Sequence, residues 1–371
     1  MTALRRQGLG RLRGRVLKLP PNRVWRTYQG GRNLDVLAGL ADPRDSHFPE
    51  DWIASVTRAV NPGRDAPDEG ISKVRDGDTG ALLSDLIAED PEYFLGPEHV
   101  RVFGPDPRVL VKFLDPSIRL HLQVHPTAAF AKAHFGSPSG KAEAYHILDV
   151  RAECKDPHVF IGFRREVSRE QLRGWILRQD IETLKDTMHR IAVCPGDTLF
   201  VPGGCPHALG AGILLVEVQE PTDWVVRFEF ERGGYTLPEE ARFMGRGLDF
   251  CLDVFDRKPL APDRLRTLAM PEPQTISADR EDAWSRERLI GTGTTPCFRM
   301  DRLHLRWAAT LANDGFHIGI VTQGKIEVAA GDNTITLERF GKYLVPAGVR
   351  DFRIHPVNGP AAVLECRPPA P

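Results

Sequence analysis

The 371-residue chain lacks several features that would place it in a class at once. None of its six cysteines forms a C-x-x-C pair, which argues against a disulfide scaffold and favours a reduced compartment. Its 49 Lys and Arg residues nearly balance 50 Asp and Glu residues, so no overall field attracts nucleic acid or an anionic membrane. We therefore expect neither nucleic acid nor a membrane as a partner.

Long apolar runs are also missing, because charges or prolines interrupt every hydrophobic stretch before it reaches the roughly 18 to 20 residues of a membrane helix. The first 15 residues carry five arginines, but no apolar segment or small-residue cleavage site follows them. We expect a cytoplasmic protein in which residues 1–20 form a basic, flexible N-terminus.

Turn-forming residues are abundant, with 30 prolines and 34 glycines spread along the chain and short β-branched runs between them. This pattern is typical of many short strands in a sandwich or barrel. In the middle of the chain, strands are predicted at 109–114, 120–124, 144–150, 158–163, 198–201, 213–218 and 225–230. In the tail they are predicted at 304–310, 319–322, 325–329, 333–337, 342–345 and 361–365. The sequence therefore predicts a mainly β protein with two β-sandwich barrels.

Helical signals are fewer and fall between the strands. Ser168 begins a capping-box pattern with Gln171, and apolar residues follow at helical spacing, so a helical excursion is predicted over 165–190. A second helical stretch is predicted from Pro238 to about Asp256. These signals divide the chain into a first β domain at 21–235, a helical linker at 236–275 and a C-terminal β domain at 276–371.

One segment combines glycine, proline and histidine at fixed spacing. Residues 196–207 (GDTLFVPGGCPH) fit the second cupin signature, G-x5-P-x-G-x2-H, at each fixed position. The glycines permit tight turns at both ends of a short strand, and Pro202 sits where no backbone donor is required. His207 then projects inward from the following strand. The pattern predicts a cupin, a small β-barrel with a site in its interior.

More residues with ligand-type side chains lie upstream. Gln123 and His125 are two residues apart, so both point to the same face of a strand, and Lys141 and Glu143 repeat this geometry. An amide oxygen, a carboxylate and two imidazoles, from Gln123, Glu143, His125 and His207, suit Zn²⁺, Mn²⁺ or Fe²⁺. Each residue alone could belong to the surface, but their coincidence with the full signature favours a metal site.

These segments resemble the type I mannose-6-phosphate isomerases, zinc-dependent double-cupin enzymes that interconvert mannose 6-phosphate and fructose 6-phosphate. Residues 120–126 (LHLQVHP) are similar to the family's L-S-I-Q-x-H-P, and residues 140–143 (GKAE) are similar to its G-K-x-E. Residues 196–212 are similar to its glycine-rich block that ends in HA-x-GAG. Downstream, residues 217–219 (EVQ) and 223–227 (DWVVR) fall at the family's spacing.

The resemblance implies one Zn²⁺ per chain, with the ligands Gln123, His125, Glu143 and His207. It also implies a sugar phosphate as the small-molecule partner, in a site lined by Lys112, Lys141, Glu217 and Arg227. One barrel would be active and the other inert. The chain departs from the family near the expected sugar, where a serine, an Asp-Lys pair and a small polar residue are replaced by His121, Thr127 with Ala128, and Trp224.

Moving a carbonyl group between C1 and C2 of a sugar requires a base for the proton on carbon and an electrophile for the enediolate that forms. A metal ion can fill the second role, and the permanently charged Arg227 can share it or clamp the substrate. We expect Glu217 to be the base, because its strand is otherwise apolar and burial raises the pKa of a carboxylate. The alternative for Glu217 is a strand-end charge that faces water.

Two lysines complete the predicted catalytic and substrate-binding set. Lys141 shares the face of Glu143 and could orient the sugar or move a proton, although a lysine beside a carboxylate is as often a plain ion pair. Lys112 lies in an apolar strand, where an unpaired cation is costly unless it faces a polar cavity. A contact with a phosphate or hydroxyl group would explain Lys112.

Three other functions compete with mannose 6-phosphate isomerisation. An isomerase of another sugar or sugar phosphate would use the same residues. A non-catalytic sugar-binding cupin would keep the pocket without a base, so Glu217 decides between enzyme and binder. A cupin dioxygenase also uses two histidines and a carboxylate on Fe²⁺, but oxygen chemistry needs neither the G-K-x-E segment nor a clamp such as Arg227.

The C-terminal region carries a weakened copy of the cupin signature. Residues 341–351 (GKYLVPAGVRD) are one residue shorter before the proline and place Asp351 where the histidine would stand. His317 is the upstream candidate, without a Gln-x-His or G-K-x-E companion. One histidine and one aspartate make a poor metal site. We predict a second cupin without metal, whose apolar strands cover one face of the first barrel.

Overall fold

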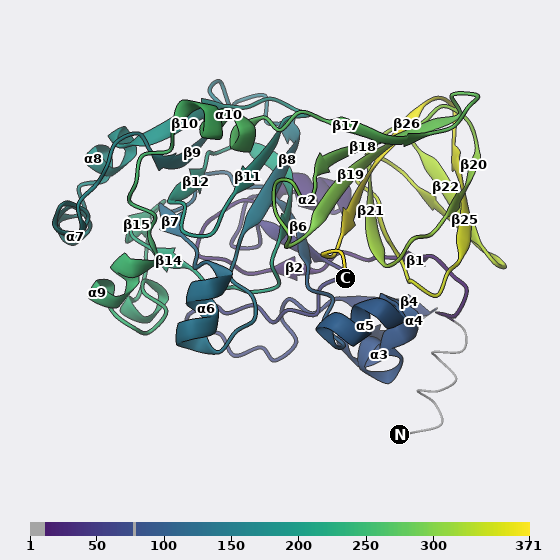
Figure 1. Cartoon of the computed structure of the whole chain (residues 1–371), viewed down its shortest axis with the longest axis horizontal. Helices are drawn as coiled ribbons and strands as arrows, with labels where there is room; N and C mark the ends of the chain where they lie inside the picture. The colour runs from purple at the N-terminus through teal and green to yellow at the C-terminus, as the bar shows by residue number, and fades with distance from the viewer. Residues whose placement is uncertain (1–11, 77–78) are drawn as a thin grey trace.

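The computed structural model describes residues 12–76 and 79–371, and Figure 1 shows two β-barrels side by side. The first barrel is built from strands between β2 and β14, and the second from strands β17 to β26 together with β1. The predicted mainly β architecture with two barrels is confirmed. The division of the chain at 235 and 275 stays a prediction.

The first barrel consists of two facing antiparallel sheets. Its six-stranded sheet has the order β11 (Thr198–Val201), β8 (Glu143–Val150), β13 (Ile213–Gln219), β6 (Leu110–Leu114), β3 (Glu50–Ile53), β2 (Arg23–Val24). Its five-stranded sheet has the order β10 (Met188–Ala192), β9 (His158–Phe163), β12 (His207–Leu209), β7 (Gln123–Val124), β14 (Val226–Arg227). The ladder at β7 is shorter than the strand predicted at 120–124.

The six-stranded sheet is buried on both faces, and its two faces carry different chemistry. Side chains alternate along each strand, so Lys112 points into the first barrel while Val111 points away from it. On the neighbouring strand, Glu217 points inward while Val216 points outward. The inner face therefore collects charged groups, and the outer face is free to pack against other apolar residues.

The second barrel pairs a seven-stranded sheet with a four-stranded sheet. The larger sheet has the order β1 (Leu17–Lys18), β24 (Lys342–Val345), β21 (His317–Gln323), β26 (Ala361–Arg367), β19 (Arg299–Leu305), β18 (Trp284–Ile290), β17 (Gln274–Ala278). The smaller sheet has the order β20 (Ala309–Ala312), β25 (Asp351–Pro356), β22 (Ile326–Ala330), β23 (Asn333–Leu337). The single strand predicted at 304–310 is wrong, because residues 306–308 separate β19 from β20.

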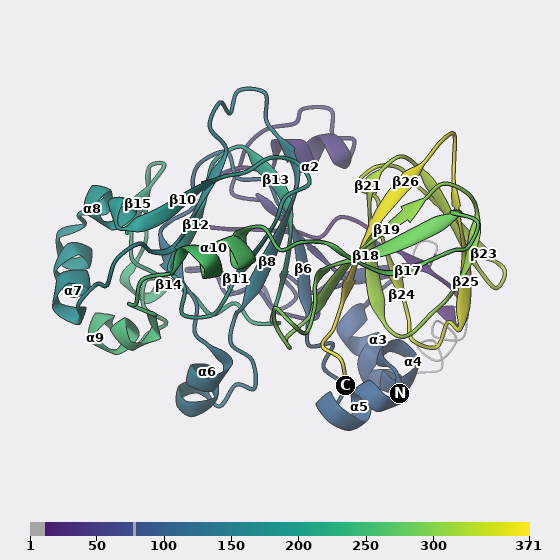
Figure 2. The same cartoon turned by 45° about the horizontal axis from the view of Figure 1, so that its top comes forward.

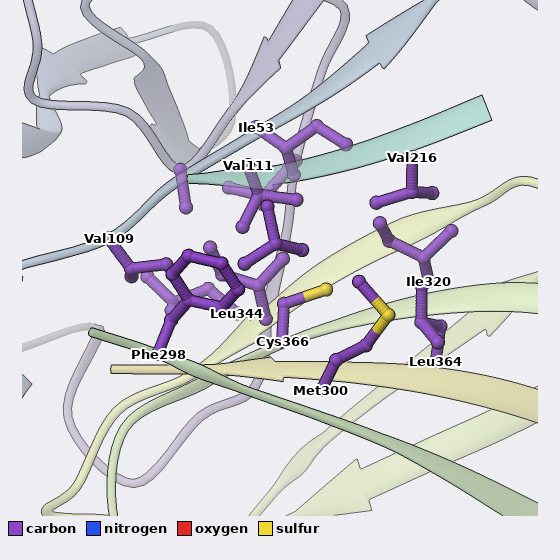
Figure 3. Close-up of a cluster of buried hydrophobic side chains, with 14 of the residues drawn as sticks. Ile53, Val109, Val111, Val216, Phe298, Met300, Ile320, Leu344, Leu364 and Cys366 are labelled. Atoms are coloured by element: carbon purple, nitrogen blue, oxygen red, sulfur yellow. The ribbon is translucent and has the colours of Figure 1, made fainter. Parts of the chain in front are cut away.

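The two barrels share an apolar interface, shown in Figure 3. From the first barrel it includes Ile53, Val109, Val111 and Val216, and from the second Phe298, Met300, Ile320, Leu344, Leu364 and Cys366. These side chains are almost completely buried. The prediction that the C-terminal region covers one face of the first barrel is confirmed.

Helices lie around the barrels, as Figure 2 shows from a second direction. They are α2 (Arg32–Leu37), α3 (Leu83–Glu89), α4 (Pro91–Leu95), α5 (Pro97–Phe103), α6 (Ala128–Phe135), α7 (Arg169–Arg178), α8 (Ile181–Asp186), α9 (Leu248–Cys251) and α10 (Pro262–Ala269). The predicted capping box is present at the start of α7, where Ser168 and Gln171 exchange side-chain and backbone hydrogen bonds. No helix within the described ranges combines the length and apolar character needed to cross a bilayer.

Two predictions about local structure need correction. The continuous helix from Pro238 to Asp256 is wrong, because Gly245 and Gly247 adopt positive φ angles of 71° and 80° and leave only η1 (Glu239–Ala241), α9 and η2 (Leu252–Val254). The flexible N-terminus is wrong for residues 12–20, because β1 pairs with β24 and Leu17 is buried. The remainder of that prediction, residues 1–11, lies outside the described residues.

Two small hairpins complete the fold. One pairs β4 (Lys73–Asp76) with β5 (Thr79–Leu82), and the other pairs β15 (Glu231–Arg232) with β16 (Tyr235–Thr236). The first leads directly into α3, the first of three consecutive helices that the sequence did not predict.

Candidate metal centre and adjoining cavity

Three of the predicted ligands meet inside the first barrel, between its two sheets. His207 begins β12 and pairs with Gln123 of β7, and His125 directly follows β7. Glu143 begins β8 on the facing sheet. One donor atom from each of His125, Glu143 and His207 lies within 4.8 Å of the others, and all three residues are buried. Two strands and a turn, distant in sequence, thus bring a nitrogen–oxygen donor set together.

The distances among these residues are short. Nε2 of His207 lies 2.9 Å from Oε1 of Glu143, and Nε2 of His125 lies 3.3 Å from Oε2 of the same carboxylate. The side-chain amide nitrogen of Gln123 lies 3.2 Å from Nε2 of His207. A half-turn of that amide places its oxygen at the same point, so Gln123 can join the donor set.

The second nitrogen of each imidazole is held by the backbone. Nδ1 of His125 donates to the carbonyl of Trp224 at 2.8 Å, and Nδ1 of His207 donates to the carbonyl of Cys205 at 2.9 Å. A carbonyl can only accept, so Nδ1 carries a hydrogen in both rings, and Nε2 of His125 accepts from Nζ of Lys141 at 2.8 Å. Burial, assisted by the Lys141 ammonium, lowers the pKa of His125 to about 3 and keeps the ring neutral.

The carboxylate of Glu143 is held in its ionised form. Its Oε2 accepts from Nζ of Lys141 at 2.5 Å, and its Oε1 accepts from the Tyr145 hydroxyl. Burial is the largest influence and raises the pKa of Glu143, but Lys141 and the other polar neighbours together outweigh it, so the pKa lies well below 4.5. A neutral imidazole, as on His125, and an ionised carboxylate, as on Glu143, are the forms that bind a divalent cation, so the donor set fits one.

Lys112 and Glu217 form a buried ion pair beside this centre. They are direct partners across β6 and β13, and Nζ of Lys112 lies 2.9 Å from Oε2 of Glu217. A second carboxylate oxygen, from Glu50, lies 3.8 Å from the same ammonium, which also sits over the ring of Trp52. Glu217 and Glu50 thus supply the counter-charge of Lys112, which also lines the polar inner cavity, and its predicted contact with a phosphate or hydroxyl group stays a prediction. Burial raises the pKa of Glu217 above 4.5 despite Lys112.

Sequence motifs did not reveal the network that surrounds this pair. Arg26 binds both oxygens of Asp223, at 2.9 and 2.8 Å, and its Nε lies 3.2 Å from Glu50. Glu50 also accepts from the Tyr28 hydroxyl at 2.7 Å. Asp223 stands four residues before Arg227 in the segment that resembles the family, which was the one available signal. The other residues lie in early strands and loops without a recognisable pattern.

An inner cavity and an outer cleft adjoin the candidate centre. The inner cavity is small, about 30 Å³, and its lining brings together most of the predicted site: Lys112, Gln123, His125, Lys141, Glu217 and Arg227. The outer cleft is larger, about 660 Å³, and shares Asp223, Val225 and Arg227 with the inner cavity. Arg227 therefore stands between the two. Burial and the nearby Arg26 lower the pKa of Arg227 to about 10.

The residues that depart from the family pattern lie close to these cavities. Trp224 lines the outer cleft and stacks on Phe135 of α6, with ring centres 4.6 Å apart. Thr127 caps the same helix by accepting from the backbone nitrogen of Phe130. His121 lines the inner cavity. These substitutions thus shape the route toward the candidate centre.

The second barrel does not bring its two candidate ligands together. His317 is buried in the seven-stranded sheet, whereas Asp351 is exposed at the start of β25 in the opposite sheet. Glu365 lies nearer to His317, but it is bound by Arg286 and Arg367. Within the described ranges, His125, Glu143 and His207 form the only metal-type cluster of His, Cys, Asp or Glu.

Comparisons with known proteins agree with this geometry. No family model matches the chain. Among curated proteins, it is 26% identical over 250 residues to "Mannose-6-phosphate isomerase ManA" of Bacillus subtilis, covering 66% of this chain and 71% of that protein. It is 33% identical over 215 residues to "Probable mannose-6-phosphate isomerase GmuF" of the same organism, covering 57% of this chain and 59% of that protein. The chain is thus similar to curated mannose-6-phosphate isomerases over 57% to 66% of its own length.

Solved structures extend the likeness over nearly the whole fold. The crystal structure of the mannose 6-phosphate isomerase from Bacillus subtilis has a TM-score of 0.71 at 23% identity, covering 95% of this chain and 99% of that one. A zinc-bound mannose 6-phosphate isomerase has a TM-score of 0.70 at 14% identity, with the same coverage. The predicted double-cupin fold of the family is confirmed. With GmuF, the match spans less than two thirds of the relative's length.

Proposed function

We propose that the protein is a cytoplasmic, metal-dependent aldose-ketose isomerase that interconverts mannose 6-phosphate and fructose 6-phosphate through an enediol. One observation carries the proposal. Buried donors from His125, Glu143 and His207 converge beside a cavity lined by Lys141, Glu217 and Arg227. An acid–base group, fixed cations and a metal-type donor set are the groups that carbonyl migration requires.

The metal part of the proposal is one Zn²⁺ per chain, held by Gln123, His125, Glu143 and His207. Support comes from the neutral imidazole of His125, the nearby imidazole of His207, the ionised carboxylate of Glu143 and the zinc-bound protein of the same fold. Mn²⁺ and Fe²⁺ accept the same nitrogen and oxygen donors. When bound, the ion supplies positive charge that stabilises the oxygen of the enediolate.

The remaining steps belong to the chain's own residues. Glu217 takes the proton from carbon, since burial raises its pKa toward the range useful for proton transfer. Lys112, at 2.9 Å, opposes the effect of burial on the pKa of Glu217 and so favours the ionised form, which is the form that accepts the proton. Lys141, whose ammonium reaches both His125 and Glu143, orients the sugar at the cavity wall.

Cationic groups in the cleft support a phosphorylated sugar as the proposed substrate. Arg227 lies where the outer cleft meets the inner cavity, and Arg58 lines the cleft further out. A guanidinium binds phosphate oxygens through paired N–H groups. A sugar phosphate entering from the cleft would meet these cations before its carbonyl end reached the inner cavity.

A second candidate is a non-catalytic sugar-binding cupin. The observation that favours it is the close Lys112–Glu217 pair, because a salt bridge at 2.9 Å between buried strands can be purely structural. This candidate keeps the cleft and the metal donors but predicts no turnover.

A conversion screen tests the proposal. The purified protein, loaded with Zn²⁺, Mn²⁺ or Fe²⁺, is incubated with mannose 6-phosphate, other hexose phosphates and free hexoses, and products are separated by chromatography. We expect conversion of mannose 6-phosphate to fructose 6-phosphate, and its loss after chelation. Conversion of another sugar in its place would reassign the substrate, and binding without any conversion would establish the non-catalytic alternative.

A further inference from the structure

The proposed chemistry leaves one buried histidine of the inner cavity without a role. His121 has 2% of its surface exposed and lines the same cavity as Gln123, His125 and Arg227. Within the described residues, it forms no hydrogen bond or ion pair with His125, Glu143 or His207. Its place in the wall is therefore unexplained by metal binding.

The orientation of the His121 ring is fixed from behind. Its Nδ1 donates to the backbone carbonyl of Glu229 at 3.0 Å. Glu229 is itself held by Arg119, through two contacts of 2.7 Å, and its carboxylate also accepts from the backbone nitrogen of Leu122 at 3.0 Å. This buried network keeps the ring from turning its other nitrogen toward the protein.

The other ring nitrogen, Nε2, is buried and has no hydrogen-bond partner. Buried polar atoms are nearly always satisfied, so an orphan in a cavity wall is a contact point for whatever enters the cavity. Because Nδ1 uses its hydrogen on the Glu229 carbonyl, the neutral ring offers a lone pair at Nε2. A sugar hydroxyl can donate to that lone pair, whereas an unprotonated phosphate oxygen can only accept.

We propose that Nε2 of His121 accepts a hydrogen bond from a hydroxyl group of the bound sugar, at a carbon away from the reacting C1 and C2. His121 is then a specificity-determining residue, which selects for the position and configuration of that hydroxyl. This inference rests on the proposed function, because it takes a hexose phosphate as the ligand. The inference adds a substrate contact at His121, a residue that the metal chemistry does not use.

Two substitutions separate the roles of the two ring nitrogens. In His121→Asn the side-chain amide nitrogen can replace Nδ1 and keep the hydrogen bond to Glu229, but nothing reaches the position of Nε2. In His121→Gln the longer side chain can place its amide near the position of Nε2. His121 does not belong to the proposed metal site. The metal content and the melting temperature of both variants should therefore equal those of the wild type.

The probes are 1,5-anhydromannitol 6-phosphate, which has no carbonyl to isomerise, and its 3-deoxy and 4-deoxy derivatives. Calorimetry on the metal-loaded proteins measures each Kd. In the wild type, removing the contacted hydroxyl should weaken binding by about 2- to 12-fold, the value of one neutral hydrogen bond. In His121→Asn this penalty should disappear, and His121→Gln should restore part of it.

Several results would overturn the inference. One is an equal loss of affinity in the wild type and in His121→Asn when the hydroxyl is removed from the ligand. Another is that neither deoxy derivative binds more weakly than the parent compound to the wild type. If His121→Asn fails to fold, a crystal structure of the wild type with the anhydromannitol decides, since a ligand hydroxyl must lie within about 3.2 Å of Nε2. A water molecule there in its place would equally contradict it. Absence of isomerase activity with intact discrimination would instead remove the proposed function alone.

Discussion

At the scale of single residues, the candidate centre depends on Glu143. This carboxylate contacts both imidazoles, accepts from Lys141 and Tyr145, and is fully buried. A metal ion bound at Glu143 would replace contacts that this carboxylate now makes with the neighbouring side chains. Removing either a carboxylate or an imidazole should therefore affect both metal affinity and the arrangement of the remaining donors.

We predict that Glu143→Ala and His207→Ala each lose the bound metal together with any isomerase activity. Metal content by mass spectrometry and activity on the same preparations provide the measurement. His304→Ala, at a half-exposed histidine of the second barrel, serves as the control and should keep the metal. Full metal occupancy in both site variants would show that the ion lies elsewhere.

Glu217→Gln should retain the metal and bind the sugar phosphate, but turnover should fall by about 10²- to 10⁴-fold, the usual contribution of a positioned general base. Because the pKa of Glu217 is raised, the wild-type rate should decline with falling pH at a pH above 4.5, where the base becomes protonated. Glu327→Gln, at an exposed position, is the control. Near-normal turnover in Glu217→Gln would make Lys141 the next candidate for the base.

Local motifs predicted the candidate ligands but not the residues that surround them. Gln123, His125 and His207 could be found because spacing within one strand or one turn fixes which side chains share a face. Arg26 and Glu50 could not, since their contact with Asp223 and Lys112 depends on which strands become neighbours. The pairing of Lys112 with Glu217 depends on the register of β6 against β13, which no single segment specifies.

At the scale of elements, β26 shows how one strand can serve two cores. Leu364 and Cys366 face the first barrel, while Val363 lies in the interior of the second barrel. Glu365, buried among these apolar residues, accepts from Arg286 and Arg367 at 3.1 Å each. Burial is the largest influence and raises the pKa of Glu365, but Arg367, Arg286 and the other neighbours together outweigh it, and the pKa lies at about 2.

Glu365→Gln should lower the free energy of unfolding at pH 7 by about 3 to 5 kcal/mol, because it leaves the buried Arg367 and the partly buried Arg286 short of a negative charge. The folded-state pKa is depressed, so the contribution of Glu365 is present above the unfolded pKa of about 4.3 and is lost as pH falls toward 2. The stability difference from the wild type should therefore shrink between about pH 4 and pH 2. Urea unfolding across this range measures it.

The control for this prediction is Glu338→Gln. That residue forms an exposed ion pair with Lys325 and should change stability by less than about 0.5 kcal/mol. A difference between Glu365→Gln and the wild type that did not depend on pH would contradict the assignment of its effect to charge.

Element type was predictable where the local pattern was strong, as at 158–163, 198–201 and the capping box of Ser168. Errors occurred where tertiary contacts decide. The strand predicted at 120–124 forms its ladder only at Gln123–Val124, and β18 was missed because its charged side chains obscure the alternation. The helix predicted from Pro238 was overestimated, since apolar spacing was given more weight than two glycines.

At the scale of the whole molecule, the two barrels are joined through the outer face of the six-stranded sheet (Figure 3). Phe298 of the C-terminal region packs 6.3 Å from Phe200 of the first barrel, ring centre to ring centre. Both rings are buried. The sheet that carries Lys112, Glu143 and Glu217 on its inner face is thus supported from outside by the second barrel.

Phe298→Ala should destabilise the protein by about 3 to 5 kcal/mol, the cost of removing a buried aromatic ring. Calorimetric unfolding should show a lower melting temperature for both barrels together, because the interface couples them. Trp307→Ala, at an aromatic side chain that is 69% exposed in the same half, should change little. Two separate transitions in the wild type would contradict the coupling.

The central claim is one metal-dependent isomerase centre per chain, at Gln123, His125, Glu143 and His207. Its most direct test is a titration of metal-stripped protein with Zn²⁺, in which the rate of mannose 6-phosphate conversion is followed against bound metal. The rate should be near zero without metal, rise linearly and reach its plateau at one equivalent per chain. Full activity in the stripped protein, or a plateau at two equivalents, would contradict the claim.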